Sequence, residues 1–346
     1  MDLDFEKDIV ELEAKIAELS KPAEQPAPEG QTAAEAKAEA KEAKAEAGEI
    51  AELKEKLEAL KKDVYANLTP WQTVQVARHD NRPLLRDYIA GVFSEFIELH
   101  GDRCFGDDHG IIGGFATIGK HRVMLVGHQK GKTVEEKVKA NFGMATPEGY
   151  RKALRLMKLA EQYGLPVISF VDTPGAYPGL DAEARGQAEA IARNLTEMSQ
   201  LQVPLLVIVT GEGGSGGALG IAVGDVVIML SNAVYSVISP EGCASILWRD
   251  GAKAPDAAEA LKLTAKSLKE LGIVDEIIAE PAGGAHRDHA ATFAAVKDRL
   301  LSHLKRLKGV APRKLVDRRY EKFAEIGRSK RSLPGKSRSK RHLRAS

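Results

Sequence analysis

The sequence predicts an α/β fold, and two features of the 346-residue chain support that class. Between residues 111 and 307, short apolar runs rich in β-branched residues alternate with segments of helical periodicity. The second feature is glycine, because five glycines fall within residues 211–217, directly after one of the apolar runs. Glycine loses much backbone entropy on folding, so such a cluster indicates a site where the backbone must be approached closely.

The expected elements follow from the two periodicities. Strands are predicted at residues 111–118, 122–127, 166–172, 204–210, 226–230 and 234–238. Helices are predicted at residues 150–163, 182–199, 257–271 and 289–307. The alternation of the two kinds of element indicates the α/β class.

Residues 1–65 are predicted to form a helical hairpin or short coiled coil. Apolar residues recur there with spacings of three and four, at Ile9, Leu12, Ile16 and Leu19 and again at Ile50, Leu53, Leu57, Leu60 and Val64. Residues 32–48, between the two segments, contain eight Ala, four Glu and three Lys, which suits a solvated helix or linker but no packed core. A globular domain is expected over residues 66–310.

The end of the chain is strongly basic. The whole sequence has 50 Lys and Arg against 49 Asp and Glu, yet residues 328–346 hold eight Lys or Arg and no acidic residue. Residues 311–346 are therefore predicted to be a basic, disordered tail. Flexible cations attract polyanions, so weak contact with nucleic acid is one hypothesis for this tail, and a solubilising role without a partner is the other.

The cysteines and the N-terminus favour a cytoplasmic protein without a membrane span. Cys104 and Cys243 are the only cysteines and lie far apart in the chain, so neither a disulfide framework nor a zinc site is expected. Both thiols are predicted to be reduced and packed in the core. The acidic N-terminus is unlike a signal or transit peptide, and no uncharged apolar run is long enough to span a bilayer.

Two motifs of nucleotide-binding proteins are incomplete. Residues 127–133 read G-H-Q-K-G-K-T and residues 172–175 read D-T-P-G, as in a GTPase. A P-loop has four residues between its two glycines, whereas three separate Gly127 from Gly131. The sequence also has no Asn-Lys-x-Asp motif, so nucleotide hydrolysis is disfavoured.

A serine hydrolase is an alternative that the motifs leave open. Gly213, Ser215 and Gly217 match G-x-S-x-G, the nucleophile elbow, and His286 follows in the right order. The elbow places its serine directly after a strand, however, whereas residues 211–214 intervene here.

A third interpretation needs no nucleophile. Residues 172–179, D-T-P-G-A-Y-P-G, follow one predicted strand, and residues 211–217, G-E-G-G-S-G-G, follow the next. Glycine-rich turns near a helix start expose backbone amides, which stabilise negative charge. The two turns are predicted to face one cleft and to bind an anion, whether a phosphate, a tetrahedral oxyanion or an enolate.

Six motifs, in this order, resemble one enzyme family. They are N-F-G-M-A-T-P-E-G-Y-R-K-A-L-R-L-M (141–157), F-V-D-T-P-G-A-Y-P-G (170–179), E-A-I-A-R-N-L (189–195), G-E-G-G-S-G-G-A-L (211–219), Y-S-V-I-S-P-E-G-C-A-S-I-L-W (235–248) and G-G-A-H-R (283–287). The chain resembles, from about Asp63 to about Leu304, the carboxyltransferase alpha subunits of bacterial-type, multi-subunit acetyl-CoA carboxylase. The N-terminal helical pair is similar too, whereas the Ala/Glu/Lys linker looks like an insertion and the basic tail has no counterpart.

The resemblance implies a crotonase-like (ClpP/crotonase) spiral of ββα units. It also implies transfer of a carboxyl group from carboxybiotin to acetyl-CoA, giving malonyl-CoA, the first committed step of fatty acid biosynthesis. The implied partners are a zinc-bearing carboxyltransferase beta subunit in an α2β2 assembly, the biotin carboxyl carrier protein, and biotin carboxylase, which uses the ATP. No metal is expected on this chain. Propionyl-CoA stays an alternative acyl substrate, because one methylene changes binding by only about 1–3 kcal/mol.

The same resemblance assigns residues to the biotin side of the site. Catalysis is assigned to Gly213, Gly214, Gly175 and Ala176, and the binding of biotin to Gly216, Gly217 and Tyr177. In this assignment Gly213 and Gly214 form the anion hole, and the facing turn lines the same cleft.

Two further sets of residues have a structural interpretation beside a functional one. The first set is basic and suits either CoA phosphates or a solvated face: Lys130, Lys132, Arg151, Lys152 and Arg155. The second set is expected to have a structural role rather than to react: His128, Cys243 and Trp248. His128 is expected to be hydrogen-bonded.

Overall fold

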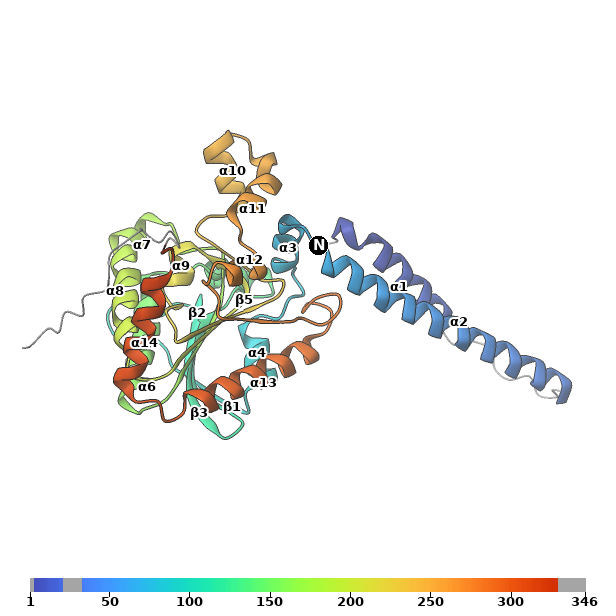
Figure 1. Ribbon diagram of the computed structural model, residues 1–346, viewed down its shortest axis with the longest axis horizontal. Helices are drawn as coiled ribbons and strands as arrows, with labels where there is room; N and C mark the ends of the chain where they lie inside the picture. Colours follow the sequence, from blue (N-terminus) through green and yellow to red (C-terminus); the bar gives the residue numbers. More distant parts are fainter. Residues whose placement is uncertain (1–2, 21–32, 329–346) are drawn as a thin grey trace, which may run out of the picture.

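One mixed sheet forms the centre of the protein, whose computed structural model describes residues 3–20 and 33–328 (Figure 1). In this described part, eight strands are ordered β1-β2-β3-β4-β5-β6-β8, and β7 pairs with β5. The strands are β1 (Glu95–Glu98), β2 (Ile111–Ile118), β3 (His121–His128), β4 (Val167–Thr173), β5 (Leu205–Gly214), β6 (Val226–Leu230), β7 (Val234–Ser236) and β8 (Glu276–Ile278). The first three strands are antiparallel, and all later neighbours run parallel.

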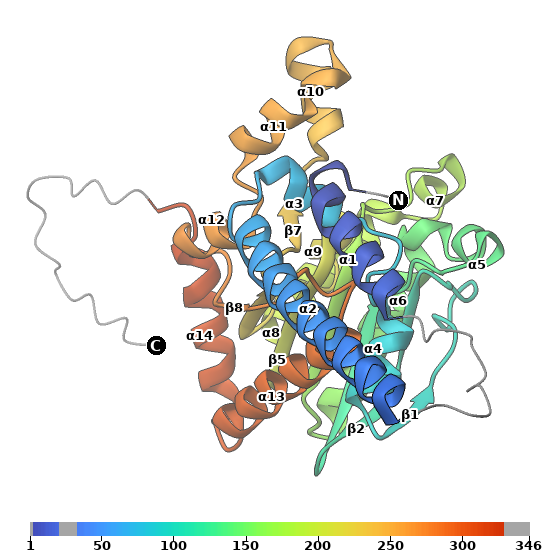
Figure 2. The same ribbon diagram turned by 90° about the vertical axis from the view of Figure 1, so that its right-hand side faces the viewer.

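Helices cover both faces of this sheet. Those of the body are α3 (Pro70–Ala77), α4 (Leu85–Val92), α5 (Val134–Lys139), α6 (Pro147–Gln162), α7 (Leu180–Ala184), α8 (Gln187–Gln200), α9 (Ser215–Leu219), α12 (Ala265–Glu270), α13 (His289–Leu307) and α14 (Pro312–Glu325). Figures 1 and 2 show α6 and α8 on one side of the sheet and α4 and α13 on the other. Every residue of β4 and β6 is buried, which explains why β6 is apolar throughout and β4 is apolar over most of its length.

Aromatic side chains join the sheet to the helices α4 and α13. The ring of Tyr88, on α4, lies 5.3 Å from that of Phe170, on β4, and 5.2 Å from that of Phe293, on α13. Such tilted and edge-on pairs add to the free energy gained by burying the rings. The apolar core therefore continues from the sheet to the outer helix layer.

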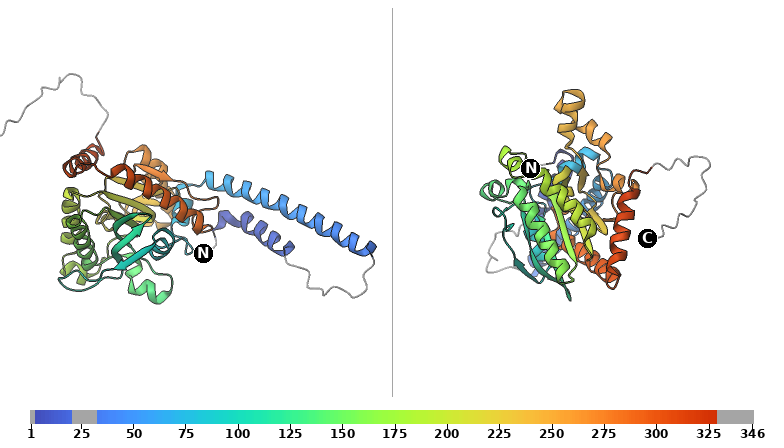
Figure 3. Two further views of the ribbon diagram at one scale, coloured as in Figure 1. Left: turned by 90° about the horizontal axis from the view of Figure 1, so that it is seen from below. Right: turned by 90° about the vertical axis from the view of Figure 1, so that its left-hand side faces the viewer.

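The expected helical hairpin is present and extends away from the body (Figures 1 and 3). The helix α1 (Lys7–Leu19) packs on α2 (Ala33–Ala66) through buried Ile9, Ile16 and Leu57. The predicted connection between the two segments falls partly on residues 21–32, which lie outside the described residues. Just before α1, the turn η1 (Asp4–Glu6) lies at the junction with the body, where Arg287 pairs with Glu6 at 3.0 Å.

A second projection, here called the arm, comprises residues 240–261. It consists of α10 (Pro240–Trp248), η3 (Gly251–Lys253) and α11 (Ala254–Leu261), and it projects from the body directly after β7 (Figure 1). Its two helices pack through Cys243, Ala244 and Ala257. The prediction that Cys243 packs is confirmed, whereas Trp248 remains 40% exposed.

The predicted strands were close to those observed, but two predicted helices are broken. Residues 182–199 divide into α7 and α8, because Gly186 adopts a left-handed conformation with φ +85°. Residues 257–271 divide into α11 and α12, because Lys262 has φ 53°. A left-handed residue at this place satisfies the helix end and stops the helix.

The prediction of a disordered segment over residues 311–346 is wrong for residues 312–325. These residues form α14, whose Leu315 and Arg319 are buried against the body. The Arg319 guanidinium is buried because it pairs with Asp225 at 2.9 Å and donates to the carbonyl oxygens of Met198 and Leu201. Most of the basic segment that follows, residues 329–346, lies outside the described residues.

Candidate functional site

The two glycine-rich segments meet at the carboxyl ends of the neighbouring strands β4 and β5. The strands run parallel, and Thr173 pairs with Gly213. Between Val171 and Thr173 the register shifts, and β5 bends around the Asp172 carboxylate, which accepts a hydrogen bond from the Glu212 amide at 2.9 Å. The predicted site residues on both strands are thereby brought to one place.

Gly213 and Gly214 lie within β5 and not in a turn after it. They pair with Tyr235 and Ser236 of β7, so the strand continues four residues beyond its predicted end at residue 210. The expectation of a turn at the start of the glycine cluster is therefore wrong. The sheet extends here because β7 supplies a further partner for the backbone of β5.

The missing side chains allow backbone to touch backbone. A Cβ atom on Gly214 would lie 2.1 Å from the Pro174 carbonyl oxygen, and one on Gly217 would lie 2.4 Å from the Gly175 carbonyl carbon. Such distances are far below van der Waals contact, so glycine is needed at both positions. At Gly213 a Cβ would meet the ring of Tyr235 at 2.7 Å.

Other positions in the same segments face open space. A Cβ on Gly175 would meet nothing within 4 Å, and the nearest atom to one on Gly216 would be 3.9 Å away. The Gly175 amide donates to the Thr173 hydroxyl at 3.1 Å, whereas the half-buried Ala176 amide has no hydrogen-bond partner among the described residues. The Ala176 amide is therefore the donor of this segment that remains available for a hydrogen bond.

The start of α9 provides further amides. The first amides of a helix have no partner within the helix, and Gly214, at the N-cap, has no side chain to supply one. Ser215 and Gly216, the first two residues of α9, are half-buried. The two segments, which are in backbone contact, therefore each carry amide donors without a partner among the described residues.

Tyr177 directly follows the first segment, residues 175–176. Its amide donates to the Ala145 carbonyl at 3.1 Å, and its ring lies where a Cβ on Gly179 would be only 2.4 Å away. The residue is half-buried. Its backbone position is therefore set by Ala145, which lies two residues before α6.

A network of paired charges lies beside the two glycine-rich segments. The Lys130 ammonium lies 2.7 Å from the Asp172 carboxylate and 2.9 Å from that of Glu212. Arg78 reaches the other side of Glu212 at 2.6 Å and Glu241 at 2.5 Å. Burial raises the pKa of Glu212, but Lys130 and Arg78 lower it more, to about 2. These contacts join β3, β4, β5, α3 and the arm.

A cleft of about 300 Å³ adjoins these charges and Pro174. Its lining includes Arg78, Lys130, Asp172 and Glu212. Each of these four charges is already paired with another of them. Neither hypothesis for Lys130, a CoA phosphate contact or a solvated face, describes this internal pair. Two acidic residues within the glycine motifs, Asp172 and Glu212, were the sequence signal that could have revealed it.

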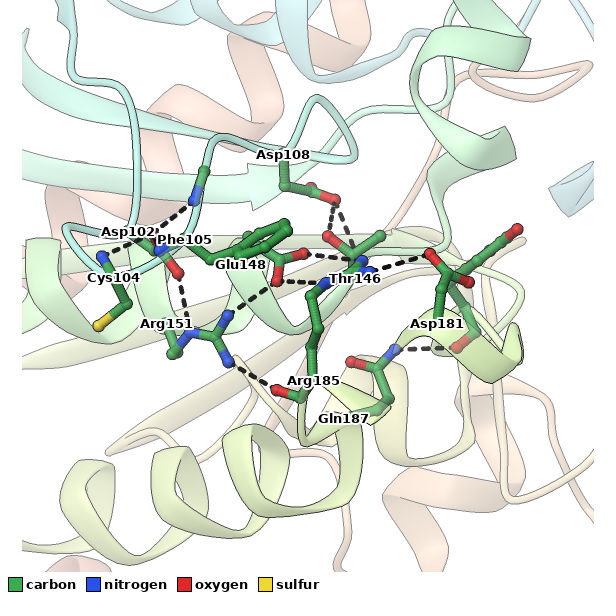
Figure 4. A network of polar contacts seen from close by, with 12 residues as sticks. Asp102, Cys104, Phe105, Asp108, Thr146, Glu148, Arg151, Asp181, Arg185 and Gln187 are labelled. Carbon is green, nitrogen blue, oxygen red and sulfur yellow. Dashed lines mark hydrogen bonds and ion pairs between the residues drawn. The ribbon is translucent and has the colours of Figure 1, made fainter. Parts of the chain in front are cut away.

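The other basic candidates also have partners on this chain. Lys132 is exposed and lies 2.6 Å from Asp87. Arg151 pairs with Asp102 and Glu148, each at 2.8 Å (Figure 4). The buried Lys152 pairs with Asp107 at 2.6 Å, and Arg155 donates to the Gly101 carbonyl at 3.0 Å. The contacts of Arg151, Lys152 and Arg155 with residues 101–107 hold the loop before β2 against α6. These three residues therefore do not form a free basic surface.

His128 and Cys104 differ from expectation. His128 is buried, yet neither ring nitrogen has a hydrogen-bond partner among the described residues, and burial lowers its pKa to about 3. The imidazole is therefore neutral. Cys104 is exposed rather than packed, because it lies in the loop that Asp102 caps through three backbone amides. Both cysteines are free thiols.

The arrangement around Ser215 is not that of a hydrolase. Ser215 adopts φ +49°, and in the described residues no histidine or carboxylate is hydrogen-bonded to its hydroxyl. His286 lies instead at the base of the hairpin, 3.6 Å from Glu6, with its ring 4.2 Å from that of His79. The alternative of a serine nucleophile therefore lacks its base.

The described residues show neither a group of metal ligands nor a membrane-spanning helix. No group of three or more His, Cys, Asp or Glu is arranged to hold a metal ion among residues 3–20 and 33–328. None of the helices in this part of the chain is both long and apolar enough to cross a bilayer.

Comparison with known proteins identifies the family. A family model described as acetyl co-enzyme A carboxylase carboxyltransferase-like matches residues 2–327. The acetyl-coenzyme A carboxylase carboxyl transferase subunit alpha of Geobacter metallireducens is 55% identical over 326 residues, which cover 94% of this chain and 97% of that protein. The chain belongs to this carboxyltransferase family. The alpha subunit of Burkholderia multivorans is 53% identical over 333 residues, covering 96% and 98% of the two chains.

Solved structures support the fold of this carboxyltransferase alpha subunit. A crystal structure of transcarboxylase 12S matches with a TM-score of 0.50 at 22% identity, over 64% of this chain and 42% of that one. The beta subunit of geranyl-CoA carboxylase from P. aeruginosa matches with a TM-score of 0.50 at 18% identity, over 74% and 46%. This chain thus spans less than half the length of either structure. At such identities the likeness concerns the fold alone, and it confirms the expected crotonase-like class.

Proposed function

We propose that this chain forms the biotin side of an acetyl-CoA carboxylase carboxyltransferase and transfers the carboxyl group of carboxybiotin to acetyl-CoA, giving malonyl-CoA. One observation carries the proposal. Two half-buried segments, residues 175–176 and 214–216, contact each other through backbone, and the amides of Ala176 and of the first residues of α9 have no partner among the described residues. The family indicates the reaction, and these amides are suited to the negative charge that it generates.

Cleavage of the N–C bond of carboxybiotin would release the carboxyl group as CO2 and leave negative charge on the ureido oxygen. The biotin anion would then take the methyl proton of acetyl-CoA, and the resulting enolate would attack the CO2. We place the hole for the ureido charge at Gly213 and Gly214, where β5 meets α9, and add the amide of Ala176 and the open face of Gly175 from the facing segment. Gly216, Gly217 and Tyr177 are proposed for the biotin side. Loss of one donor in an oxyanion hole costs about 10²–10³ in kcat, so a few aligned amides suffice for a large effect.

We propose that the charged side chains around the cleft hold the two strands in place and contribute to its electrostatic field. Lys130, Arg78 and Glu212 are engaged with one another and with Asp172. A paired network of this kind keeps β4 and β5 in register without adding a free charge that would compete with the amides. We therefore assign to it no role as acid or base.

The partners of the reaction belong to the same proposal. A zinc-bearing beta subunit is proposed to complete the acetyl-CoA side in an α2β2 assembly, the biotin carboxyl carrier protein to deliver carboxybiotin, and biotin carboxylase to use the ATP. The kcat/KM values measured with propionyl-CoA and with acetyl-CoA decide the acyl preference. Equal kcat/KM values would overturn the assignment to acetyl-CoA.

We place the contact with the beta subunit on the arm. Three consecutive apolar residues of α10, Ile246, Leu247 and Trp248, are 72%, 63% and 40% exposed. Exposed apolar patches of this kind mark protein interfaces. The arm starts at the end of β7, which pairs with Gly213 and Gly214, so a subunit seated on it would lie beside the proposed hole.

The variant Gly175→Ala tests the site in the complete assembly. Its methyl group would enter open space beside the Ala176 amide without backbone strain, so we expect kcat to fall at least about tenfold while the Tm is unchanged. Gly106→Ala is the matched control, because a Cβ there also meets nothing within 4 Å. Wild-type kcat in Gly175→Ala would contradict the proposed site.

A further inference from the structure

The two facing segments are held by the same helix, α8. The first segment is held through Gln187, whose side-chain amide donates to the carbonyl oxygens of Tyr177, at 3.0 Å, and Ala145, at 2.8 Å. Since the Tyr177 amide also donates to the Ala145 carbonyl, the backbone of Tyr177 is held at both its amide and its carbonyl group. Gln187 is the first residue of α8.

The second segment is held through Asn194. Its buried side-chain amide donates to the carbonyl oxygens of Gly220 and Tyr150, each at 2.9 Å. The Tyr150 hydroxyl in turn donates to the Gly217 carbonyl at 3.2 Å, and a Cβ on Gly220 would lie 2.6 Å from the Tyr150 ring. The C-terminal half of α9 is therefore fixed to α6 and α8 together.

The two amide groups are used in the same way. Each NH2 group has two donors and meets two carbonyl oxygens, while Gln187 Oε1 and Asn194 Oδ1 are buried without a partner in the described residues. Gln187 and Asn194 are seven residues apart, about two helical turns, so they lie on the same side of α8. The spacing between the two held segments is thus set along one rigid helix.

The start of α8 is itself anchored. Arg185, two residues before Gln187, pairs with Glu148 of α6 at 2.9 Å, and Arg151 donates to the Arg185 carbonyl at 3.0 Å. Figure 4 shows Arg151 and Arg185 both reaching Glu148, close to Gln187. The helix therefore cannot slide along α6 without breaking buried or half-buried ion pairs.

We infer that Gln187 and Asn194 are positioning residues that set the gap between the amide of Ala176 and the amides at the start of α9. The inference rests on the proposed function, because the gap matters only if those amides hold the charge of the reaction. Misplacement by about 1 Å can cost about 10²-fold in rate. The two side chains act on the amides through Tyr177 and through Gly217 and Gly220, and neither is itself a catalytic residue.

The test uses Gln187→Met in the complete assembly with its beta subunit and carboxybiotin carrier. Methionine keeps the length of the side chain but removes both donors, so we expect kcat to fall about 10- to 100-fold with KM for acetyl-CoA within about twofold of wild type. Gln200→Met, at the exposed end of the same helix, is the matched control and should keep wild-type kcat. The Tm of both variants, from thermal unfolding, should stay near that of wild type.

A double-mutant cycle separates positioning from general stability. If Gln187 acts through the segment that contains Gly175, then Gln187→Met and Gly175→Ala should not be additive, and the double variant should lose no more kcat than the worse single variant. Multiplied losses, or a fall in kcat that follows a fall in Tm, would overturn the inference. Asn194→Asp extends the test, because a carboxylate would face the two carbonyl oxygens that the NH2 group now meets.

The outcomes also separate this inference from the proposed function. Reduced kcat in Gly175→Ala together with normal kcat in Gln187→Met would overturn the positioning role and leave the site standing. Normal kcat in Gly175→Ala would overturn the proposed site and the positioning role with it.

Discussion

Gly214 and Gly217 are the residues at which the facing segments approach most closely. Their assignment to the site stays a prediction, but the structure adds a packing reason for glycine that the expected amide-exposing turn did not include. The structure shows backbone packed on backbone at Pro174 and Gly175, with no room for one carbon atom. Sequence reasoning identifies the glycines because of their density, whereas the atoms that exclude a side chain come from a segment some 40 residues away.

Two single substitutions distinguish packing from exposure. Gly214→Ala should destabilise the protein by about 1–3 kcal/mol, because its Cβ would overlap the Pro174 carbonyl and force the strands apart. Gly216→Ala should be nearly neutral in stability, since the nearest atom would be 3.9 Å away. Urea unfolding of the two variants measures the difference, and equal midpoints would contradict this account.

The ion pairs of Glu212 predict a dependence of stability on pH. The folded-state pKa, about 2, lies below the usual value of 4.5, so the stabilisation is complete above about pH 4.5 and is lost as the pH falls towards 2. Glu212→Gln should therefore lower the Tm at pH 7 and change it less at pH 3. A Tm difference from wild type that does not shrink on acidification would disagree with this prediction.

At the scale of elements, α14 shows how a buried charge can define a helix. Its sequence is rich in Arg and Lys and was assigned to a disordered tail for that reason. One of these residues, Arg319, is fully buried, and its guanidinium meets Asp225 and three carbonyl oxygens. Composition cannot distinguish such a residue from its exposed neighbours, because the partners lie in distant segments.

Substitution of that arginine should be costly. Arg319→Met removes one partner of a buried ion pair and should destabilise the protein by about 3–5 kcal/mol, since Asp225 is left without its countercharge. Arg318→Met is the control, because Arg318 is exposed on the same helix. Thermal unfolding compares the two, and equal Tm values would show that Arg319 does not anchor α14.

At the scale of the whole molecule, the arm and the hairpin project from a body that the sheet organises (Figure 1). The body contains the proposed hole at the end of β5, and the arm begins after β7, which pairs directly with that end. A docking partner and the cleft are therefore linked through β7 and β5. This geometry leads to predictions about assembly rather than about folding.

Leu247→Ser should weaken the complex with the beta subunit at least about tenfold without changing the Tm, because a central apolar contact would be lost. Leu271→Ser is the control, since that leucine is 59% exposed on the body. Sedimentation of the variants mixed with the beta subunit gives the affinities. Unchanged affinity in Leu247→Ser would place the interface elsewhere.

Removal of residues 329–346 should leave carboxyl transfer unchanged, because the segment lies beyond the last described helix and beyond the family match, which ends at residue 327. Its clustered cations should give weak, salt-dependent retention on nucleic acid that the truncated chain lacks. Retention on an oligonucleotide column at low salt compares the two proteins. Equal retention would end the nucleic-acid hypothesis, and lost activity would show that the tail contributes to the reaction.

Local patterns determined much of this protein. Apolar runs predicted β2, β3, β4 and β6 to within a residue or so of their ends, because strands buried in the core carry mostly apolar side chains. The heptad-like spacing predicted the packed pair α1 and α2. Glycine density located the two segments that meet beside β4 and β5, and motif order predicted the family, since each motif is a run of residues that are close together in the chain.

Only the tertiary structure decided how those parts meet. It extended β5 to Gly214 by pairing it with β7, broke two predicted helices at left-handed residues, and turned basic residues such as Lys130 and Arg319 into internal partners. It also showed that Gln187 and Asn194, on one helix, donate hydrogen bonds to the carbonyl oxygens of Tyr177 and Gly220. These features join segments far apart in sequence, and the free energy of such contacts depends on geometry that no local pattern contains.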